Sequence, residues 1–248
     1  HGEVFVTEDG GECDMDIGNY ERFLNQSIPK SHNITTAQVY SAVIEAERKG
    51  EYLGACVQII PHITDEIKNR IRKIAEEEKL DFLIVECGGT VGDIESLPFL
   101  EALRQMRVEE GPQNVIFVHV TLAPSLDVVG EQKTKPTQHS AQELRRIGIQ
   151  PDFLAVRCTT PLEEKTKKKI ALFTNVTAND VLSCHDVKSI FQVPQILYDQ
   201  GIMDSLFTKF GKVGMVNASA NWDKWNAIAD SMINHEDKKV KIAMVGKY

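Results

Sequence analysis

The sequence lacks paired cysteines, a long apolar run and a basic, apolar leader. Its cysteines number five, an odd count, and no two of them form a Cys-x-x-Cys pair. This usage is typical of a reducing compartment and argues against a disulfide framework and against zinc. Because no apolar run could cross a bilayer and no secretory leader is present, we expect a cytoplasmic protein with no membrane partner.

Basic charge is also scarce. The 248 residues include 36 Asp and Glu against 28 Lys and Arg, which gives a net charge of −8. Nucleic-acid-binding proteins normally present a basic face, so we expect no nucleic-acid partner. An anionic small ligand remains compatible with this balance, because a local cluster of lysines can focus the electric field.

Two further absences concern the start of the chain and phosphate binding. The first residue is His1 rather than Met, so we expect a chain that is cut or processed there. The pattern Gly-x-x-x-x-Gly-Lys-Ser/Thr, whose backbone N–H groups cradle phosphates, occurs nowhere in the sequence.

What is present is an alternation of strand-like and helix-like segments. The strand-like segments are residues 3–7, 55–60, 81–86, 114–122, 153–158, 180–184 and 239–245. The helix-like segments are residues 36–49, 64–79, 141–147, 163–173, 194–198 and 222–233, and another opens at residue 97. Strands separated by helices of this length predict an α/β fold with a mostly parallel sheet flanked by helices.

The most informative segment is the loop at residues 86–96. A strand-like run ends at Glu86, a glycine-rich stretch follows, and Asp93 and Glu95 precede the next helix. In open α/β sheets, ligands bind beyond the carboxyl ends of the strands. Carboxylates gathered there favour either Mg²⁺ or hydrogen bonds from a polar ligand, and the residues alone leave both open.

A second loop, residues 130–140, also follows a strand-like run. Lys133 and Lys135 flank a threonine, and Thr137, Gln138 and Ser140 stand at a predicted helix start. Free N–H groups at a helix start favour anions, so the loop suits a phosphate chain. A solvated basic loop is an equally good interpretation.

Two other clusters have plainer alternatives. The lysines at 165 and 167–169 are typical of a solvated helix face, although Lys169 leads into an apolar run and could lie near a cleft. Glu12, Asp14 and Asp16 alternate along a strand-like segment and would share one face. A metal ion would neutralise that face, whereas surface exposure is the commoner outcome.

Several longer segments match a known family along the whole chain. They are His1-Gly-Glu-Val-Phe-Val-Thr-Glu-Asp-Gly, Gly18-Asn-Tyr-Glu-Arg-Phe, Pro61-His-Ile-Thr, Gly88-Gly-Thr-Val-Gly-Asp-Ile-Glu-Ser-Leu-Pro-Phe, Lys133-Thr-Lys-Pro-Thr-Gln-His-Ser and Met244-Val-Gly-Lys-Tyr248. With these segments the chain resembles the CTP synthases, specifically their amidoligase (synthetase) domain. The resemblance implies a P-loop NTPase-like, Rossmann-like domain over residues 1–233. Residues 234–248 would be a linker and the first strand of a glutamine amidotransferase (glutaminase) domain that is otherwise missing.

The resemblance also implies a reaction and a set of contacts. UTP, ATP and ammonia would give CTP, ADP and phosphate through a 4-phosphorylated UTP, with the ammonia coming from glutamine. By motif match, the Mg²⁺ ligands are expected to be Asp16 and Glu86, and the ATP contacts Asp16, Arg157 and Asp186. The expected contacts to UTP, or to CTP as feedback inhibitor, are Asp93, Glu95, Lys133, Gln138 and Lys169. A homotetramer with nucleotide pockets assembled between subunits is implied too, and filament formation is left open.

The chain departs from the family pattern at its start. The strand and the lysine-bearing phosphate loop with which the family begins are absent from this sequence. We therefore expect the chain as it stands to be inactive alone, an expectation that CTP formation from ammonium chloride would refute. Two rival interpretations are another ATP-dependent ligase with the dethiobiotin-synthetase-like fold, and a non-catalytic module that binds nucleotides or assembles.

Overall fold

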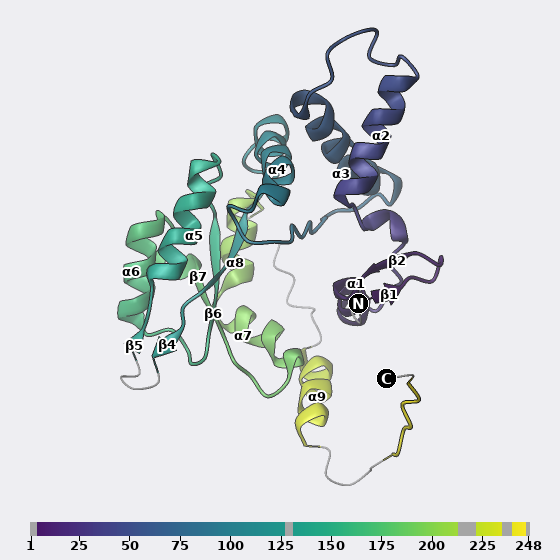
Figure 1. The fold of residues 1–248 in the computed structure, drawn as a ribbon. Coiled ribbons are helices and arrows are strands. Elements are labelled where there is room, and N and C mark those ends of the chain that lie inside the picture. Colours follow the sequence, from purple (N-terminus) through teal and green to yellow (C-terminus); the bar gives the residue numbers. More distant parts are fainter. Residues whose placement is uncertain (1–3, 127–130, 213–221, 235–239, 247–248) are drawn as a thin grey trace. The chain divides into compact units, whose positions relative to one another are not determined.

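The computed structural model describes residues 4–126, 131–212, 222–234 and 240–246. The chain forms two compact units, His1–Met106 and Arg107–Tyr248 (Figure 1). No helix in the described part of the chain combines the length and the apolar character that a membrane crossing requires.

The first unit is mostly helical. Strands β1 (Val4–Val6) and β2 (Glu12–Asp14) form an antiparallel hairpin that leads into helix α1 (Met15–Leu24). The elements that follow are η1 (Lys30–His32), α2 (Thr36–Arg48), η2 (Ile59–Ile63), α3 (Thr64–Glu77), η3 (Ile94–Ser96) and α4 (Leu97–Glu110), which crosses from the first unit into the second. Helix α2 begins with a capping box, in which the side chains of Thr35 and Gln38 accept hydrogen bonds from each other's backbone N–H groups.

Helices α2 and α3 pack through apolar residues that are spaced by one helical turn. Val39 and Val43 of α2 are almost fully buried in one cluster with Ile67 and Ile71 of α3 and Ala102 of α4. A spacing of four residues places each pair on one face of its helix. The two helices predicted for residues 36–49 and 64–79 are thereby confirmed.

Two strands predicted in this unit are wrong. Residues 55–60 form no strand, and from Ile59 the chain winds into the wide helical turn η2. Residues 81–86 are extended, but within the described residues no neighbouring strand pairs with them. Their apolar side chains therefore stay largely uncovered, with Ile84 89% exposed. The apolar run predicts a buried strand, but burial requires a pairing partner as well as an apolar sequence.

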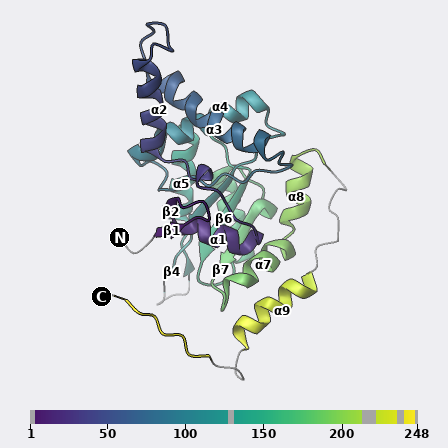
Figure 2. The same ribbon diagram turned by 90° about the vertical axis from the view of Figure 1, so that its right-hand side faces the viewer.

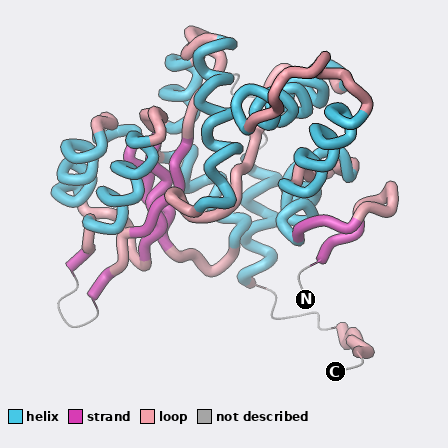
Figure 3. Tube along the Cα trace, turned by 45° about the horizontal axis from the view of Figure 1, so that its top comes forward, coloured by secondary structure: helices cyan, strands magenta, loops and turns pink. Residues whose placement is uncertain are grey.

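The second unit is built on a parallel sheet (Figure 3). Strands β3 (Val118–Leu122), β6 (Phe153–Cys158) and β7 (Val181–His185) pair in the order β3-β6-β7, and β4 (Ser125–Leu126) and β5 (Glu131–Gln132) form a small antiparallel hairpin. The helical elements are α5 (Lys135–Arg146), α6 (Glu164–Thr174), η4 (Ala178–Asp180), η5 (Ile190–Gln192), α7 (Val193–Asp199), α8 (Ile202–Lys209) and α9 (Trp222–Ile233). The predicted α/β fold, a parallel sheet flanked by helices, is confirmed.

Helices contact both faces of the central strand β6. Leu154 and Val156 are fully buried in a cluster that includes Ile170 of α6. Phe153 points to the opposite face, because successive residues of a strand alternate. Its ring lies 5.1 Å from the Nζ atom of Lys209 in α8.

Helix α9 packs beside α7 and η5, and two views show α7 and α9 as neighbours (Figures 1 and 2). The rings of Tyr198 and Trp222 are 4.7 Å apart, and the indole N–H of Trp225 donates to the carbonyl of Phe191 at 2.7 Å. The strand predicted at residues 239–245 is wrong over its described part, because residues 240–245 form no strand. Residue 239 lies outside the described residues.

Two largely buried carboxylates at the amino ends of the strands attach surrounding segments to the sheet. Asp152, directly before β6, pairs with Arg107 and accepts a hydrogen bond from the N–H of Phe117 at 2.8 Å. Asp180, directly before β7, is 3% exposed and pairs with Lys209 of α8 at 2.9 Å. Both carboxylates are therefore held within the protein and serve the fold.

The environment of Asp180 favours its charged form. Burial alone would raise the pKa of the Asp180 carboxyl, but hydrogen bonds from Ser205, Lys209 and Thr177 outweigh burial and hold the pKa below its ordinary value. A lowered pKa in the folded state stabilises the fold fully above the unfolded pKa of about 4. This contribution is lost as the pH falls through the folded pKa.

We expect Asp180→Asn to lower the free energy of unfolding by about 2 kcal/mol at pH 7, because an ammonium and two hydroxyl donors lose a charged acceptor. The deficit should shrink as the pH falls below about 4. Urea unfolding at both pH values measures it. Asp230→Asn makes the same change at an exposed position of α9 and should cost less than about 0.5 kcal/mol. If Asp180→Asn lowered the free energy of unfolding no more than Asp230→Asn does, or lowered it more in acid than at pH 7, Asp180 would not stabilise the fold through its charged form.

Candidate functional site

In the first unit, the structure brings two of the predicted metal ligands into one neighbourhood. Asp16 lies in the first turn of α1, and Glu86 ends the extended segment 81–86. Burial raises the pKa of the Glu86 carboxyl, and repulsion from Asp16 and Asp14 raises it further. Asp14 is engaged as the cap of α1, where its side chain accepts the N–H of Asp16 at 2.9 Å. The acidic side chains that remain for a ligand are thus Asp16 and Glu86.

The sequence interpretation that placed three acidic residues on one strand face is wrong. Strand β2 ends at Asp14, and Asp16 belongs to helix α1. Within the described residues, no group of three or more His, Cys, Asp or Glu side chains is arranged to hold a metal ion. Two carboxylates nevertheless suit Mg²⁺, which commonly uses one or two protein carboxylates together with water and substrate phosphates.

Tyr20 of α1 adjoins these carboxylates and was not singled out by the sequence. Burial, followed by the charges of Glu86, Asp16 and Asp14, raises the pKa of the Tyr20 phenol to about 12. The phenol is therefore neutral at physiological pH and adds no negative charge to the group. Its position one turn after Asp16 in α1 was the available signal, and that signal is weak without the fold.

The loop that follows Glu86 carries the two expected uridine contacts. Gly89 and Gly92 have φ angles of +92° and +106°, which side chains with a Cβ rarely adopt. The carboxylate of Asp93 accepts the N–H of Thr90 at 3.3 Å and so closes the loop on itself. Glu95 is exposed in the short turn η3. The structure thus places both residues in one loop and leaves their ligand contacts as predictions.

In the second unit, lysines gather around one carboxylate. The ammonium of Lys133 lies 2.6 Å from the carboxylate of Glu131 in β5. The pKa of Glu131 is lowered, first by its hydrogen bond and ion pair with Lys133 and then by the charges of Lys169 and Lys165. Lys133 and Lys169, predicted as contacts to one nucleotide, therefore both act on the charge of Glu131. Lys165 joins them, although its place in a lysine run suggested only a solvated face.

The polar residues at the start of α5 have mostly internal roles. Thr137 donates its hydroxyl proton to the carbonyl of Leu122 at 2.9 Å, and Ser140 is 2.9 Å from the ring of His119. These two hydroxyls were expected near a phosphate chain, and they instead attach α5 to β3. The carboxamide of Gln138 is buried and donates to the hydroxyl of Thr134 at 2.9 Å.

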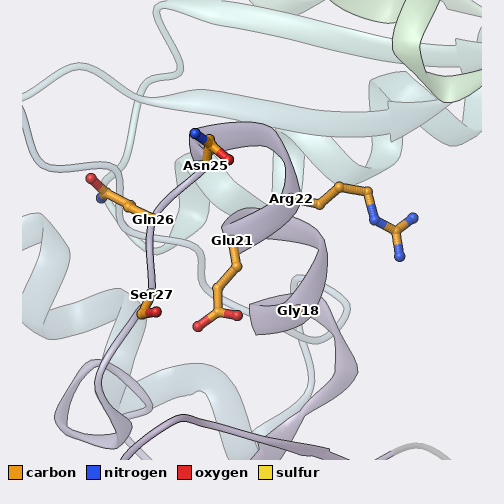
Figure 4. Close-up of a pocket in the computed structure, with 6 residues that line it drawn as sticks. All are labelled: Gly18, Glu21, Arg22, Asn25, Gln26 and Ser27. Atoms are coloured by element: carbon orange, nitrogen blue, oxygen red, sulfur yellow. The ribbon is translucent and has the colours of Figure 1, made fainter. Parts of the chain in front are cut away.

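Gln138 also lines a hollow of about 300 Å³ between α5 and the end of α6. Its other lining residues are Lys135, His139, Gln142, Arg145 and Phe173. A second, wide hollow of about 430 Å³ lies at the end of α1 (Figure 4). Its lining residues, Gly18, Glu21, Arg22, Asn25, Gln26 and Ser27, include none of the predicted site residues.

Gln132 anchors the lysine loop and was missed by the sequence analysis. Its side-chain amide donates to the carbonyl of Pro161 at 2.9 Å and to that of Thr160 at 3.2 Å. Its side-chain oxygen accepts the N–H of Glu163, the cap residue of α6, at 3.1 Å. The residue before Lys133 is thereby tied to the start of the helix that carries Lys169.

The carboxyl ends of β6 and β7 present the two residues expected at the adenine end of ATP. The guanidinium of Arg157 donates to the carboxylate of Asp186 at 2.9 Å and to the carbonyl of Cys184. Both charged side chains are more than half exposed. The two residues thus form an exposed ion pair, and their contact with ATP stays a prediction.

The second unit is an α/β domain that presents the pair Arg157 and Asp186 at the carboxyl ends of a parallel sheet, where domains of this class bind ligands. Comparison with known families identifies the domain. The family described as CTP synthase N-terminus matches residues 1–212, and the chain belongs to this family. The match removes the rival interpretation as a dethiobiotin-synthetase-like ligase.

The chain is also similar to curated CTP synthases. Those of Thermococcus gammatolerans and Pyrococcus abyssi are both 57% identical to it, over 248 and 252 residues. A CTP synthase of Thermus thermophilus is 51% identical over 248 residues. Each alignment covers 100% of this chain and 44 or 45% of the relative. The chain therefore spans less than half the length of these relatives.

We expect Glu131→Gln to tighten the binding of inorganic tripolyphosphate about 2–5-fold, because Lys133 loses an internal competitor and Lys165 and Lys169 lose a nearby negative charge. The gain should diminish as the salt concentration rises. Calorimetric titration measures both effects. Glu143→Gln removes a carboxylate that pairs with Arg146 on α5 and serves as the control, with unchanged affinity expected. An unchanged or weaker affinity in Glu131→Gln would show that these lysines do not act together on an anion.

Proposed function

We propose that this chain carries the synthetase site of a CTP synthase, which converts UTP, ATP and ammonia to CTP, ADP and phosphate. Family membership supports the reaction class. The observation that carries the assignment to this site is the gathering of Lys133, Lys165 and Lys169 around Glu131. Several ammonium groups near one point suit a triphosphate, and they come from two segments that Gln132 connects.

The chemistry explains why ATP is required in addition to UTP. The oxygen at C4 of uracil is a poor leaving group, so the oxygen first takes the γ-phosphoryl group of ATP. The nitrogen of ammonia then forms a bond to C4, and the C4–O bond breaks as phosphate leaves with the electron pair. The protein's part in such a reaction is mainly to position the phosphates and neutralise their charge.

The nucleotide contacts follow from the expected residues. Lys133 and Lys169 hold the phosphates of UTP, and the same groups hold CTP when it acts as a feedback inhibitor. Gln138 completes this site from α5, on condition that its carboxamide exchanges its bond with Thr134 for the ligand. Asp93 and Glu95 accept hydrogen bonds from the uridine moiety, for which their loop leaves Glu95 exposed.

The ATP contacts involve different groups. Asp16 and Glu86 fit Mg²⁺, because both supply carboxylate oxygens, and because the pKa of Glu86 is raised by burial and, to a smaller extent, by repulsion from Asp16 and Asp14 that a cation would relieve. When bound, Mg²⁺ offsets the charge of the transferred phosphoryl group. Arg157 and Asp186 contact the adenine end, where the guanidinium and the carboxylate offer a donor and an acceptor side by side.

Two features of the assembly belong to the same proposal. The ammonia is supplied by a glutaminase domain, and the active form is a homotetramer. The curated CTP synthases extend well beyond the aligned region, since this chain covers 44 or 45% of them. Sedimentation of the full-length protein, with and without nucleotides, tests the tetramer.

We expect Lys133→Ala to weaken UTP and CTP binding about 10–100-fold, because one charge-assisted contact to phosphate is lost. Calorimetric titration with each nucleotide and Mg²⁺, in the full-length protein, measures it. Lys168→Ala removes an exposed charge from the same helix as Lys169 and should change affinity less than about 2-fold. Equal effects of the two substitutions would sink the assignment of the pyrimidine-nucleotide site.

We expect Asp16→Asn and Glu86→Gln each to lower kcat by about 100-fold or more and to raise the Mg²⁺ concentration needed for half-maximal rate. CTP formation by the full-length protein with ammonium chloride, followed across a Mg²⁺ titration, measures both. Asp14→Asn is the control, because Asn caps a helix as well as Asp does. Wild-type Mg²⁺ dependence in the first two variants would contradict their role.

A further inference from the structure

The side chain of Gln200, directly after α7, pairs with the backbone of β7. Its oxygen accepts the N–H of Ser183 at 2.8 Å, and its amide donates to the carbonyl of Ser183 at 3.0 Å. β7 is an edge strand of the described sheet. One carboxamide thus supplies the two hydrogen bonds that a further strand would offer at this residue.

The same carboxamide joins β7 to two helices. It donates to the carbonyl of Ile196 in α7 at 3.1 Å and accepts a hydrogen bond from the ammonium of Lys167 in α6 at 3.3 Å. Ser183 is 4% exposed, and its hydroxyl accepts the N–H of Leu162, just before α6, at 3.0 Å. Ser183 is therefore fixed through its N–H, its carbonyl and its hydroxyl.

The residues directly after Ser183 form the exposed pair at the end of the sheet. The carbonyl of Cys184 and the carboxylate of Asp186 both accept hydrogen bonds from Arg157, and the N–H of Asp186 donates to the carbonyl of Cys158 at 3.1 Å. An exposed ion pair contributes only about 0–1 kcal/mol and cannot by itself hold its partners in place. The pairing of β7 with β6 and the buried anchor at Ser183 hold these residues in place.

We propose that Gln200 is a positioning residue for ATP. It holds the carboxyl end of β7, so that Asp186 and Arg157 stand ready for the adenine end of the nucleotide. This inference rests on the proposed function, because that function assigns ATP to this pair. The pyrimidine nucleotide meets Lys133 on a different segment, which Gln132 anchors separately. The two nucleotides should consequently respond differently to loss of Gln200.

The test uses the full-length protein with ammonium chloride as nitrogen source. Gln200→Met keeps the length of the side chain and removes its hydrogen bonds, whereas Gln200→Glu keeps an acceptor for Ser183 and Lys167. We expect Gln200→Met to raise the KM for ATP about 10-fold and Gln200→Glu to raise it less. The KM for UTP should stay within about 2-fold of wild type in both. Amide hydrogen exchange at residues 183–186 should be faster in Gln200→Met.

Gln150→Met is the matched control. The carboxamide of Gln150 donates to three backbone carbonyls, those of Pro151, Thr174 and Asn175, at 2.9, 3.1 and 3.3 Å. It does so at the amino end of β6, away from the charged pair. We expect Gln150→Met to lower the melting temperature about as much as Gln200→Met and to leave both KM values unchanged.

The outcomes separate the inference from the function on which it rests. Equal rises in both KM values, or a loss of stability alone, would overturn the positioning role of Gln200. Absence of CTP formation by the wild-type protein would overturn the proposed function instead. In that case calorimetric titration with ATP and Mg²⁺ decides about Gln200, and equal affinity in wild type and in both Gln200 variants refutes its role.

Discussion

The pairing of β6 on both of its edges is the constraint on which residues 107–248 depend. β6 lies between β3 and β7, and Phe153, Leu154 and Val156 are fully excluded from solvent. Each such side chain contributes about 1.5–3 kcal/mol on burial. Because neighbouring residues of β6 face opposite sides, helices on both faces of the sheet contact this one strand. The position of β6 therefore also fixes where the loop at its carboxyl end begins.

The two ends of this sheet carry polar groups of different character. At the amino ends, Asp152 and Asp180 are largely buried and fully engaged by protein donors, so their removal affects folding. At the carboxyl ends, Arg157 and Asp186 are exposed and pair mainly with each other. A ligand that replaces one partner there costs little stability, because an exposed ion pair contributes only about 0–1 kcal/mol. The residues that stabilise the fold thus lie at the amino ends of the strands, and the residues expected to bind a ligand lie at the carboxyl ends.

The sequence predicts correctly those elements whose apolar faces are covered by neighbouring elements. Its predictions fail where a segment needs a partner strand that its own sequence does not reveal. Residues 153–158 and 222–233 form β6 and α9 with the predicted bounds. Residues 81–86 are as apolar as a buried strand, yet they form none, because within the described residues no strand pairs with them. Periodicity reports which faces are apolar and does not report what covers them.

The candidate site shows the same limit. The lysine loop was recognisable from its motif, because charges and helix starts leave a local signature. Gln132 and Gln200 leave no such signature, because their partners are distant in the sequence. Gln132 bonds to backbone groups of residues 160, 161 and 163, which lie 28–31 residues away, and Gln200 bonds to the backbone of Ser183, 17 residues away. An uncharged carboxamide gains its role from the backbone groups that the fold brings to it.

The start of α5 shows which groups can attract an anion to the lysine loop. Thr137 and Ser140 direct their hydroxyls to β3, and Pro136 has no N–H to offer. The first turn therefore presents fewer donors than its sequence suggested, and the positive charge must come from lysine side chains. Lys133 is already paired with Glu131, so a phosphate exchanges one anionic partner for another. Without a ligand, the carboxylate of Glu131 therefore reduces the repulsion among the ammonium groups of this region. That repulsion is considerable, because helix α6 carries Lys165, Lys167, Lys168 and Lys169 within five residues.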